Sequence, residues 1–185
     1  KMMKRIFFLV VISLTVAACN TEEPSKPKQL SAEEIKQEAF DEIMAMEKSM
    51  MAVQSGILDT IKATKLSKLY FSYALNNLKD SISSEFMFKS GELRMGVGQF
   101  VKSIEIFEQL NRSFPAHDKL VETKYLIAFI YHNHMGNLGI AEAKYQEVID
   151  KHPEHVLAQD ARVAIKTLTL SDEELIEMFE KKNGI

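Results

Sequence analysis

From residue 31 onward, apolar residues recur every three or four positions, which is the spacing of one face of an α-helix. In the first such segment, residues 31–52, the positions predicted to face inward are Ile35, Ala39, Ile43, Met46 and Met50. In the second segment, residues 58–78, they are Ile61, Leu66, Leu69, Tyr70 and Tyr73. No run of alternating apolar and polar residues is bounded by Gly or Asn-Gly turns, so the sequence offers no candidate strand. We therefore expect an all-α fold.

Capping residues and a proline mark several of the predicted helix ends. Ser31 and Glu34 have the spacing of a capping box, in which a serine oxygen and a glutamate each accept a hydrogen bond from a free backbone amide. Ser171 and Glu174 repeat this pattern near the end of the chain. Pro153 falls just beyond another predicted helix, where a residue without an amide hydrogen cannot continue the hydrogen-bond ladder.

Between these boundaries the periodicity predicts helices at 83–96, 99–113, 118–134, 138–151 and 155–168, and a last helix after Ser171. The last helix carries Leu175, Met178 and Phe179 on one side. Because short connections make successive helices antiparallel, we expect a chain of helical hairpins.

Two of these hairpins repeat each other. Residues 98–115 align without a gap over residues 136–153, and their terminal prolines, Pro115 and Pro153, are 38 residues apart. The alignment pairs a turn glycine, a small residue, an aromatic residue and an aliphatic residue: Gly98 with Gly136, Ser103 with Ala141, Phe107 with Tyr145 and Leu110 with Val148. Upstream, Gly91 and Ala128 fall at a small position of the first helix of each pair.

This arrangement resembles the tetratricopeptide repeat. Small residues allow two helices to approach closely, and aromatic residues fill the wider gap to the next hairpin. The resemblance implies a short right-handed superhelix of stacked antiparallel hairpins. The longer loop at 116–120 and an additional residue in the second turn depart from the regular repeat. A generic helical bundle is the alternative interpretation.

The first thirty residues have a different character. Lys4 and Arg5 precede an apolar run, and Ile6 to Ala18 provides only 13 residues, whereas a membrane-spanning helix needs about 20. Residues 16–19, Val-Ala-Ala-Cys, resemble the bacterial lipobox, which implies cleavage before Cys19 and a lipid on its sulfur. An ordinary signal peptide with a chance cysteine is the alternative. Because the chain begins with Lys1, the initiator is either Met2 or Met3 or a methionine upstream of Lys1.

The predicted organisation follows from these segments: 1–18 is a lipoprotein signal peptide, 19–30 a lipidated flexible tether, 31–82 a degenerate N-terminal hairpin, 83–117 and 118–154 tetratricopeptide-like repeats, and 155–185 C-terminal capping helices. A lipid on Cys19 would hold the protein at a membrane without any spanning helix.

The cysteine count limits how the fold can be stabilised, and the net charge limits the possible partners. Cys19 is the only cysteine, so no disulfide can stabilise the fold and a packed core must do so. Loss of residues 1–18 lowers the number of basic residues from 23 to 20 against 26 acidic ones, which moves the net charge from −3 to −6. An acidic protein is a poor partner for nucleic acid.

Residues 84–181 resemble the C-terminal region of tetratricopeptide lipoproteins of the Gram-negative outer membrane, a family that includes the lipoprotein of the β-barrel assembly machine and the Tol–Pal coordinating factor. This likeness is carried by residues 152–155, His-Pro-Glu-His, followed by Ala158 and Ala161, and by the ending at residues 168–175. The resemblance implies a non-enzymatic scaffold for envelope proteins, with a role in outer-membrane or β-barrel assembly. The alternative is a lipoprotein that binds cell wall or a small ligand and assists envelope metabolism.

Such arrays bind extended or helical segments along the first helix of each pair, and in this register the partner-binding groove would be lined by Phe88, Glu92, Met95, Tyr125, Phe129 and His132. Aromatic residues and a methionine beside a carboxylate suit an apolar anchor with a basic neighbour. Alternatively, Phe88, Tyr125 and Phe129 only pack against the next hairpin.

The sequence gives little support for a catalytic site or a metal site. His132 and His134 are two positions apart and cannot share an ion from one helix. Residues 91–98 hold three glycines but no lysine at phosphate-loop spacing. We expect no catalytic residue, no metal and no cofactor other than the lipid on Cys19.

Localisation is predicted from the tether. Asn20 replaces the aspartate that retains many lipoproteins in the inner membrane, which favours the outer membrane on its periplasmic side. Glu22 and Glu23 faintly resemble a surface-export signal, so display at the cell surface is the alternative.

Overall fold

Eight α-helices make up the computed structural model, which describes residues 30–51, 58–168 and 170–183. They are α1 (Ala32–Met51), α2 (Thr60–Asn76), α3 (Ser83–Gly96), α4 (Phe100–Ser113), α5 (Leu120–Asn133), α6 (Leu138–Lys151), α7 (Val156–Thr167) and α8 (Asp172–Asn183). No strand occurs within these ranges, so the all-α prediction is confirmed. The predicted signal peptide, Cys19 and most of the tether lie outside the described residues.

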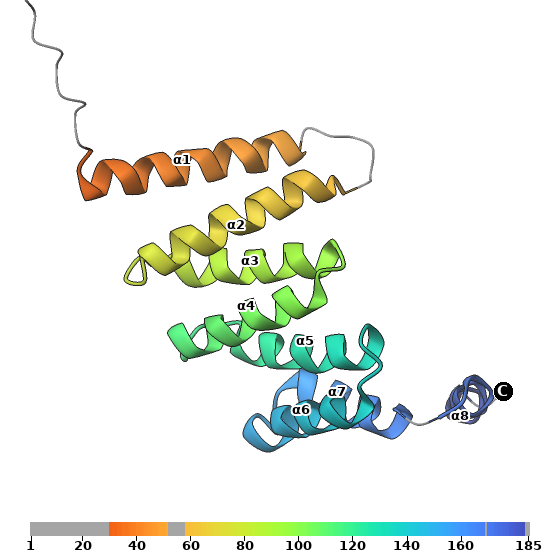
Figure 1. Ribbon diagram of the computed structural model, residues 1–185. Helices are drawn as coiled ribbons and strands as arrows, with labels where there is room; N and C mark the ends of the chain where they lie inside the picture. The colour runs from red at the N-terminus through yellow and green to blue at the C-terminus, as the bar shows by residue number, and fades with distance from the viewer. Residues whose placement is uncertain (1–29, 52–57, 169, 184–185) are drawn as a thin grey trace, which may run out of the picture. The chain divides into compact units, whose positions relative to one another are not determined.

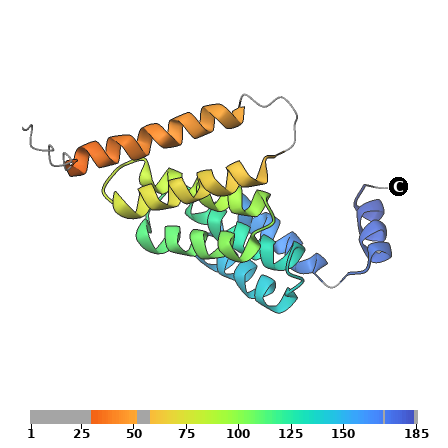
Figure 2. The same cartoon turned by 45° about the horizontal axis from the view of Figure 1, so that its top comes forward.

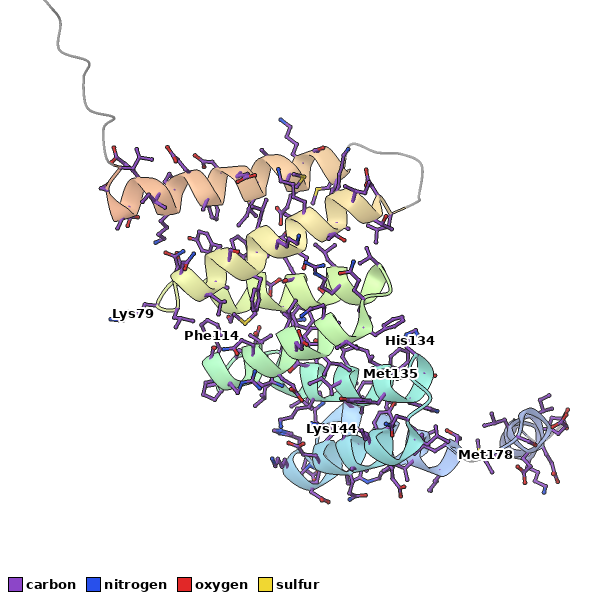
Figure 3. All side chains as sticks on the ribbon, in the orientation of Figure 1. Lys79, Phe114, His134, Met135, Lys144 and Met178 are labelled. Atoms are coloured by element: carbon purple, nitrogen blue, oxygen red, sulfur yellow. The ribbon has the colours of Figure 1, made fainter. Side chains whose placement is uncertain are left out.

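From α1 to α7, each helix packs against the next one in sequence (Figure 1). The contacts run without a break from α1 through α7, and α5 additionally touches α7. The same order of neighbours is visible after a 45° turn (Figure 2). Lys79 after α2 and Phe114 after α4 lie at one end of the packed helices, whereas His134 and Met135 after α5 lie at the other (Figure 3). Successive helices from α2 to α6 are therefore antiparallel.

Two clusters of buried side chains hold these helices together. The first is built mainly from α2, α3 and α4, with contributions from α1 and α5, and its large members include Tyr70, Phe86 and Phe107. The second joins α5, α6 and α7 around Ala128 and Tyr145. Because burial of apolar surface is the main driving force of folding, these clusters account for a fold that contains no disulfide in its described part.

The two aligned copies pack in the same way. In the first copy, Gly91 and Ser103 are buried at the crossing of α3 and α4, and the ring of Phe107 lies against Gly91. In the second copy, Ala128 and Tyr145 are buried at the crossing of α5 and α6. The remaining buried positions of the alignment are Leu110, Ala141 and Val148. Pro115 and Pro153 are exposed just beyond α4 and α6.

The turns between paired helices explain the aligned glycines. Gly98 has φ +75° and Gly136 has φ +61°, a region that glycine adopts without steric cost. After α3, Gln99 donates to the carbonyl of Arg94 at 2.8 Å and Gly98 donates to that of Met95 at 3.0 Å, the pair of bonds that closes a Schellman motif. The first connection spans residues 97–99 and the second spans residues 134–137, one residue longer.

Side-chain caps begin several of the helices. Asp59 accepts hydrogen bonds from the amides of Ile61 and Lys62 at 3.1 and 3.0 Å, which starts α2. Ser171 and Glu174 form the reciprocal capping box expected from their spacing, with bonds of 2.8 and 3.2 Å. These caps satisfy amides that have no partner inside the helix.

Two predicted inward positions are wrong. Ile35 is 55% exposed and Ile61 is 82% exposed, although each continues the apolar stripe of its helix. Each lies in the first turn of α1 or α2. Of the other stripe positions, Ile43, Leu66, Tyr70 and Tyr73 are buried and the rest are half-buried.

None of the helices in the described ranges has both the length and the apolar character needed to cross a membrane.

Candidate functional site

The six predicted groove residues come from two helices. Phe88, Glu92 and Met95 belong to α3, and the other three, Tyr125, Phe129 and His132, belong to α5. Glu92 is exposed and Phe88 is buried, whereas the remaining four are half-buried. A partner could therefore touch five of these residues, but not Phe88.

Phe88 is part of the core and does not present an exposed ring, which corrects its predicted role. Its side chain is only 4% exposed and its ring lies 5.9 Å from that of Phe107. The Nζ of Lys119, at the start of α5, lies 5.2 Å from the centre of the Phe88 ring. A cation over an aromatic face is attracted to it, so Phe88 positions Lys119 while filling the space beneath it.

Glu92 lies in a group of charges on α3 and the beginning of α5. Its side chain is exposed, but partial desolvation of its carboxylate raises its pKa, with further contributions from the negative charges of Glu122 and Glu85. Lys119 and Lys89 act on it in the opposite direction. This surface, formed by Glu85, Lys89, Glu92, Lys119 and Glu122, is called the α3–α5 charged face below.

Both lysines of the α3–α5 charged face already have carboxylate partners. Lys119 lies 3.2 Å from Glu122, and Lys89 lies 3.2 Å from Glu47 of α1. Glu85 and Glu92, by contrast, have no hydrogen-bond or ion-pair partner among the described residues. The face thus offers two carboxylates that accept no hydrogen bond from a described residue and interact with Lys119 only at longer range, so each can still pair closely with a positive charge.

The aromatic residues of α5 pack against the hairpin but keep part of their surface accessible. Tyr125 lies 5.3 Å from the Tyr145 ring and His132 lies 6.1 Å from it. Phe129 contacts His134 edge-on at 5.7 Å, and His134 in turn stacks on Phe100 at 4.1 Å. These contacts fix the rings in place, so they would lose little entropy on contact with a partner.

Two carboxylates, each with two partners, link helices in a way that sequence spacing did not predict. Glu47 of α1 accepts from the Tyr70 hydroxyl of α2 and pairs with Lys89 of α3. At the other end of the same helices, Asp80 accepts from Tyr73 at 2.8 Å and pairs with Lys36 at 3.0 Å. Tyr70 and Tyr73 sit on the predicted inward stripe, and a buried tyrosine hydroxyl needs a partner, which was the only signal in the sequence.

His155, Gly91 and Gly96, which could suggest a metal or phosphate site in the sequence, have structural roles in the fold. His155 caps α7 through Nδ1, which accepts from the amide of Leu157 at 3.2 Å. Gly91 and Gly96 are helical and lie within α3. Across the described ranges, no three His, Cys, Asp or Glu side chains are grouped so that they could hold a metal ion.

Neither a family model nor a curated protein matches the chain.

Proposed function

We propose that this chain is a membrane-anchored, non-enzymatic scaffold of tetratricopeptide type that binds a partner protein in the bacterial cell envelope. The anchoring part of the proposal rests on the sequence around Cys19, and the repeat part rests on the two aligned copies. The matched burial of Gly91 with Phe107 and of Ala128 with Tyr145 supports a repeated hairpin. Outer-membrane location on the periplasmic side rests on Asn20 in the tether and on the resemblance, and a role in envelope assembly rests on the resemblance.

The observation that carries the proposal is the α3–α5 charged face. Glu85 and Glu92 make no hydrogen bond or close ion pair with a described residue, although Lys119 acts on both at longer range, and they lie on the same two-helix face as the half-buried Met95 of α3 and Tyr125 and Phe129 of α5. Free carboxylates next to fixed aromatic and thioether groups suit a protein segment that carries an apolar anchor and a lysine or arginine. Unlike charges across an interface favour encounter and select the partner.

Site-specific crosslinking in intact cells tests this binding face. A photoreactive amino acid at position 92 or 122 should capture a defined protein. The same amino acid at position 142, an exposed glutamate of α6, is the control and should capture none. Equal capture at all three positions would argue against a binding face on α3 and α5.

Alanine variants of the half-buried aromatics give a second test. Tyr125→Ala and Phe129→Ala should weaken recovery of the captured protein while circular dichroism remains helical. Unchanged recovery in both variants would remove these residues from the interface. Stabilisation of the purified chain by muropeptides, with no protein captured at any position, would favour the alternative of a cell-wall-binding or small-ligand-binding lipoprotein.

A further inference from the structure

A cavity of about 320 Å³ lies between α2 and α4, at the C-terminal part of α3. Four cationic side chains line it, Lys68, Arg94, Lys102 and Arg112, and they are accompanied by a single carboxylate, that of Glu105. This imbalance sets the cavity apart, because the chain as a whole carries a net negative charge.

Arg94 is the most unusual of these residues, because its side chain is buried with only 8% exposed. Its Nε donates to Ser67 Oγ at 2.8 Å, Nη1 donates to Gln99 Oε1, and Nη2 lies 3.4 Å from the carbonyl oxygen of Thr64. All three acceptors are neutral. Among the described residues, no carboxylate pairs with this guanidinium.

A buried guanidinium without a counter-charge is costly, and arginine is rarely buried unless it is paired. Arg94 lies in the last turn of α3, where the helix dipole offers a partial negative charge. That interaction is weaker than a carboxylate or phosphate, which can engage a guanidinium through two parallel hydrogen bonds. An anion would therefore stabilise the Arg94 guanidinium more than its present neutral acceptors do.

The other cations of the cavity add to this preference. Lys68 is exposed and has no hydrogen-bond or ion-pair partner in the part of the chain that the structure describes. Lys102 pairs with Glu105 at 2.6 Å, which uses the only carboxylate of the cavity. Arg112 is 3.8 Å from Glu108, a distance typical of a loose surface pair. Positive charge is thus left over around the cavity.

Part of the cavity wall is apolar. Phe71 of α2 is half-buried and Ile106 of α4 is buried, and both line the cavity beside the charged groups. An apolar wall next to fixed polar groups is the usual composition of a small-molecule site. An organic anion would bury its apolar part against this wall while its charged head reaches Arg94.

We propose that the α2–α4 cavity binds a small organic anion whose carboxylate or phosphate group is held by Arg94 and Lys68 and whose apolar part contacts Phe71 and Ile106. Arg94 fixes the head group from inside and Lys68 covers it from the solvent side. The site is separate from the α3–α5 charged face, so it does not depend on the proposed protein partner.

Titration calorimetry on the full chain in detergent micelles tests this assignment. The probes are benzoate and phenyl phosphate, with benzyl alcohol as the neutral analogue and inorganic phosphate as the anion without an apolar part. We expect saturable binding of at least one aromatic anion, weaker binding of inorganic phosphate and no binding of benzyl alcohol. The aromatic anion that binds more tightly identifies the preferred head group. Absence of saturable binding by both aromatic anions below roughly 10 mM would overturn the proposal.

Three variants locate the site. Lys68→Gln, which changes an exposed residue, should weaken binding of the aromatic anion by roughly fivefold, the value of a partly exposed ion pair. Arg94→Gln should abolish it. Lys166→Gln removes an equal charge from an exposed position of α7 and should leave binding unchanged. If Lys166→Gln weakens binding as much as Lys68→Gln, the effect is general electrostatics and the proposal fails. If Arg94→Gln unfolds the chain, the comparison between the two lysine variants still decides the outcome.

Discussion

A Cβ atom built on Gly91 would lie 2.4 Å from Cε1 of Phe107, closer than any real contact of this kind. The approach is reinforced by Ser103, whose hydroxyl donates to the carbonyl oxygen of Gly91 at 2.8 Å. Gly91 therefore lets α3 and α4 come together over the face of a buried aromatic ring. In the second copy the corresponding first-helix position is Ala128, which is fully buried in the same cluster as Tyr145.

The first prediction concerns Gly91→Ala. Alanine gains about 1 kcal/mol over glycine in a helix, but overpacking a rigid core costs about 1–3 kcal/mol. Because the Phe107 ring is fully buried and cannot move aside freely, we expect the overpacking cost to lie at the upper end, about 2–3 kcal/mol, which leaves a net loss of about 1–2 kcal/mol in the free energy of unfolding, measured by urea denaturation. Gly139→Ala, in α6, is the matched control, since a Cβ added there would have no atom within 4 Å and stability should stay constant or rise. A stabilised Gly91→Ala variant would show that the Phe107 ring can move to make room for the added Cβ.

The second prediction concerns the turn glycines. A residue with a Cβ pays about 1–2 kcal/mol to adopt a left-handed conformation, and neither Gly98 nor Gly136 has an atom within 4 Å that would add a clash. We therefore expect Gly98→Ala and Gly136→Ala each to lower the free energy of unfolding by about 1 kcal/mol. Because asparagine tolerates this conformation better, Gly98→Asn and Gly136→Asn should lose less. Equal losses for alanine and asparagine would mean that backbone conformation is not the cause.

The helices could be predicted from sequence because their evidence is local. Spacing of apolar residues, capping patterns and prolines lie within a few residues of the feature that they mark, and the two aligned copies reinforced each other. The stripe rule failed at Ile35 and Ile61, because periodicity gives the direction in which a side chain points but not how far along the helix a neighbour extends. A residue in the first turn of a helix is buried only if the neighbouring helix extends that far.

The candidate sites were harder to predict, because they depend on contacts between distant parts of the chain. Phe88 was expected at an exposed position, but whether a ring is covered depends on where Lys119 and Phe107 come to lie. Arg94 follows Met87 and Ser90 at helical spacing, so its place on the buried stripe of α3 was visible in the sequence. The absence of a nearby carboxylate was not visible, since its neighbours Thr64 and Ser67 come from another helix.

The third prediction concerns the pH dependence of partner binding, and it rests on the proposed function. The pKa of Glu92 is raised in the free protein, mainly by partial desolvation. A cationic group of the partner would stabilise the charged carboxylate and lower this pKa, so affinity should be full above the free-state pKa and fall as pH decreases through it. Glu92→Gln should bind more weakly near pH 7 and lose this pH dependence, as measured by calorimetry with the captured partner. A partner whose affinity is the same from pH 4 to pH 7 does not use Glu92.

The fourth prediction concerns Glu147, which joins α5 to α6. Its Oε1 lies 2.5 Å from Nζ of Lys124 and 2.8 Å from Nζ of Lys151, and these bonds lower the pKa of Glu147 from 4.5 to about 2. A carboxylate with a lowered pKa in the folded state contributes stability that is complete above its ordinary pKa and is lost as pH falls toward the folded value. The relevant window therefore runs from about pH 4.5 down to about pH 2.

Glu147→Gln isolates this contribution. After allowance for solvent screening of a partly exposed group, we expect the variant to lose about 1 kcal/mol of unfolding free energy at pH 7. The difference from the unmodified chain should shrink below pH 4.5, be mostly lost near pH 2, where about half of the folded-state glutamate is protonated, and disappear below that pH, because a protonated glutamate resembles glutamine. Glu142→Gln, at an exposed position of the same helix, makes the same change in charge and should have little effect at either pH. Urea titrations across this range measure both variants, and a deficit in Glu147→Gln that persists unchanged at pH 2 would assign its effect to packing, since most of the ion-pair contribution is lost there.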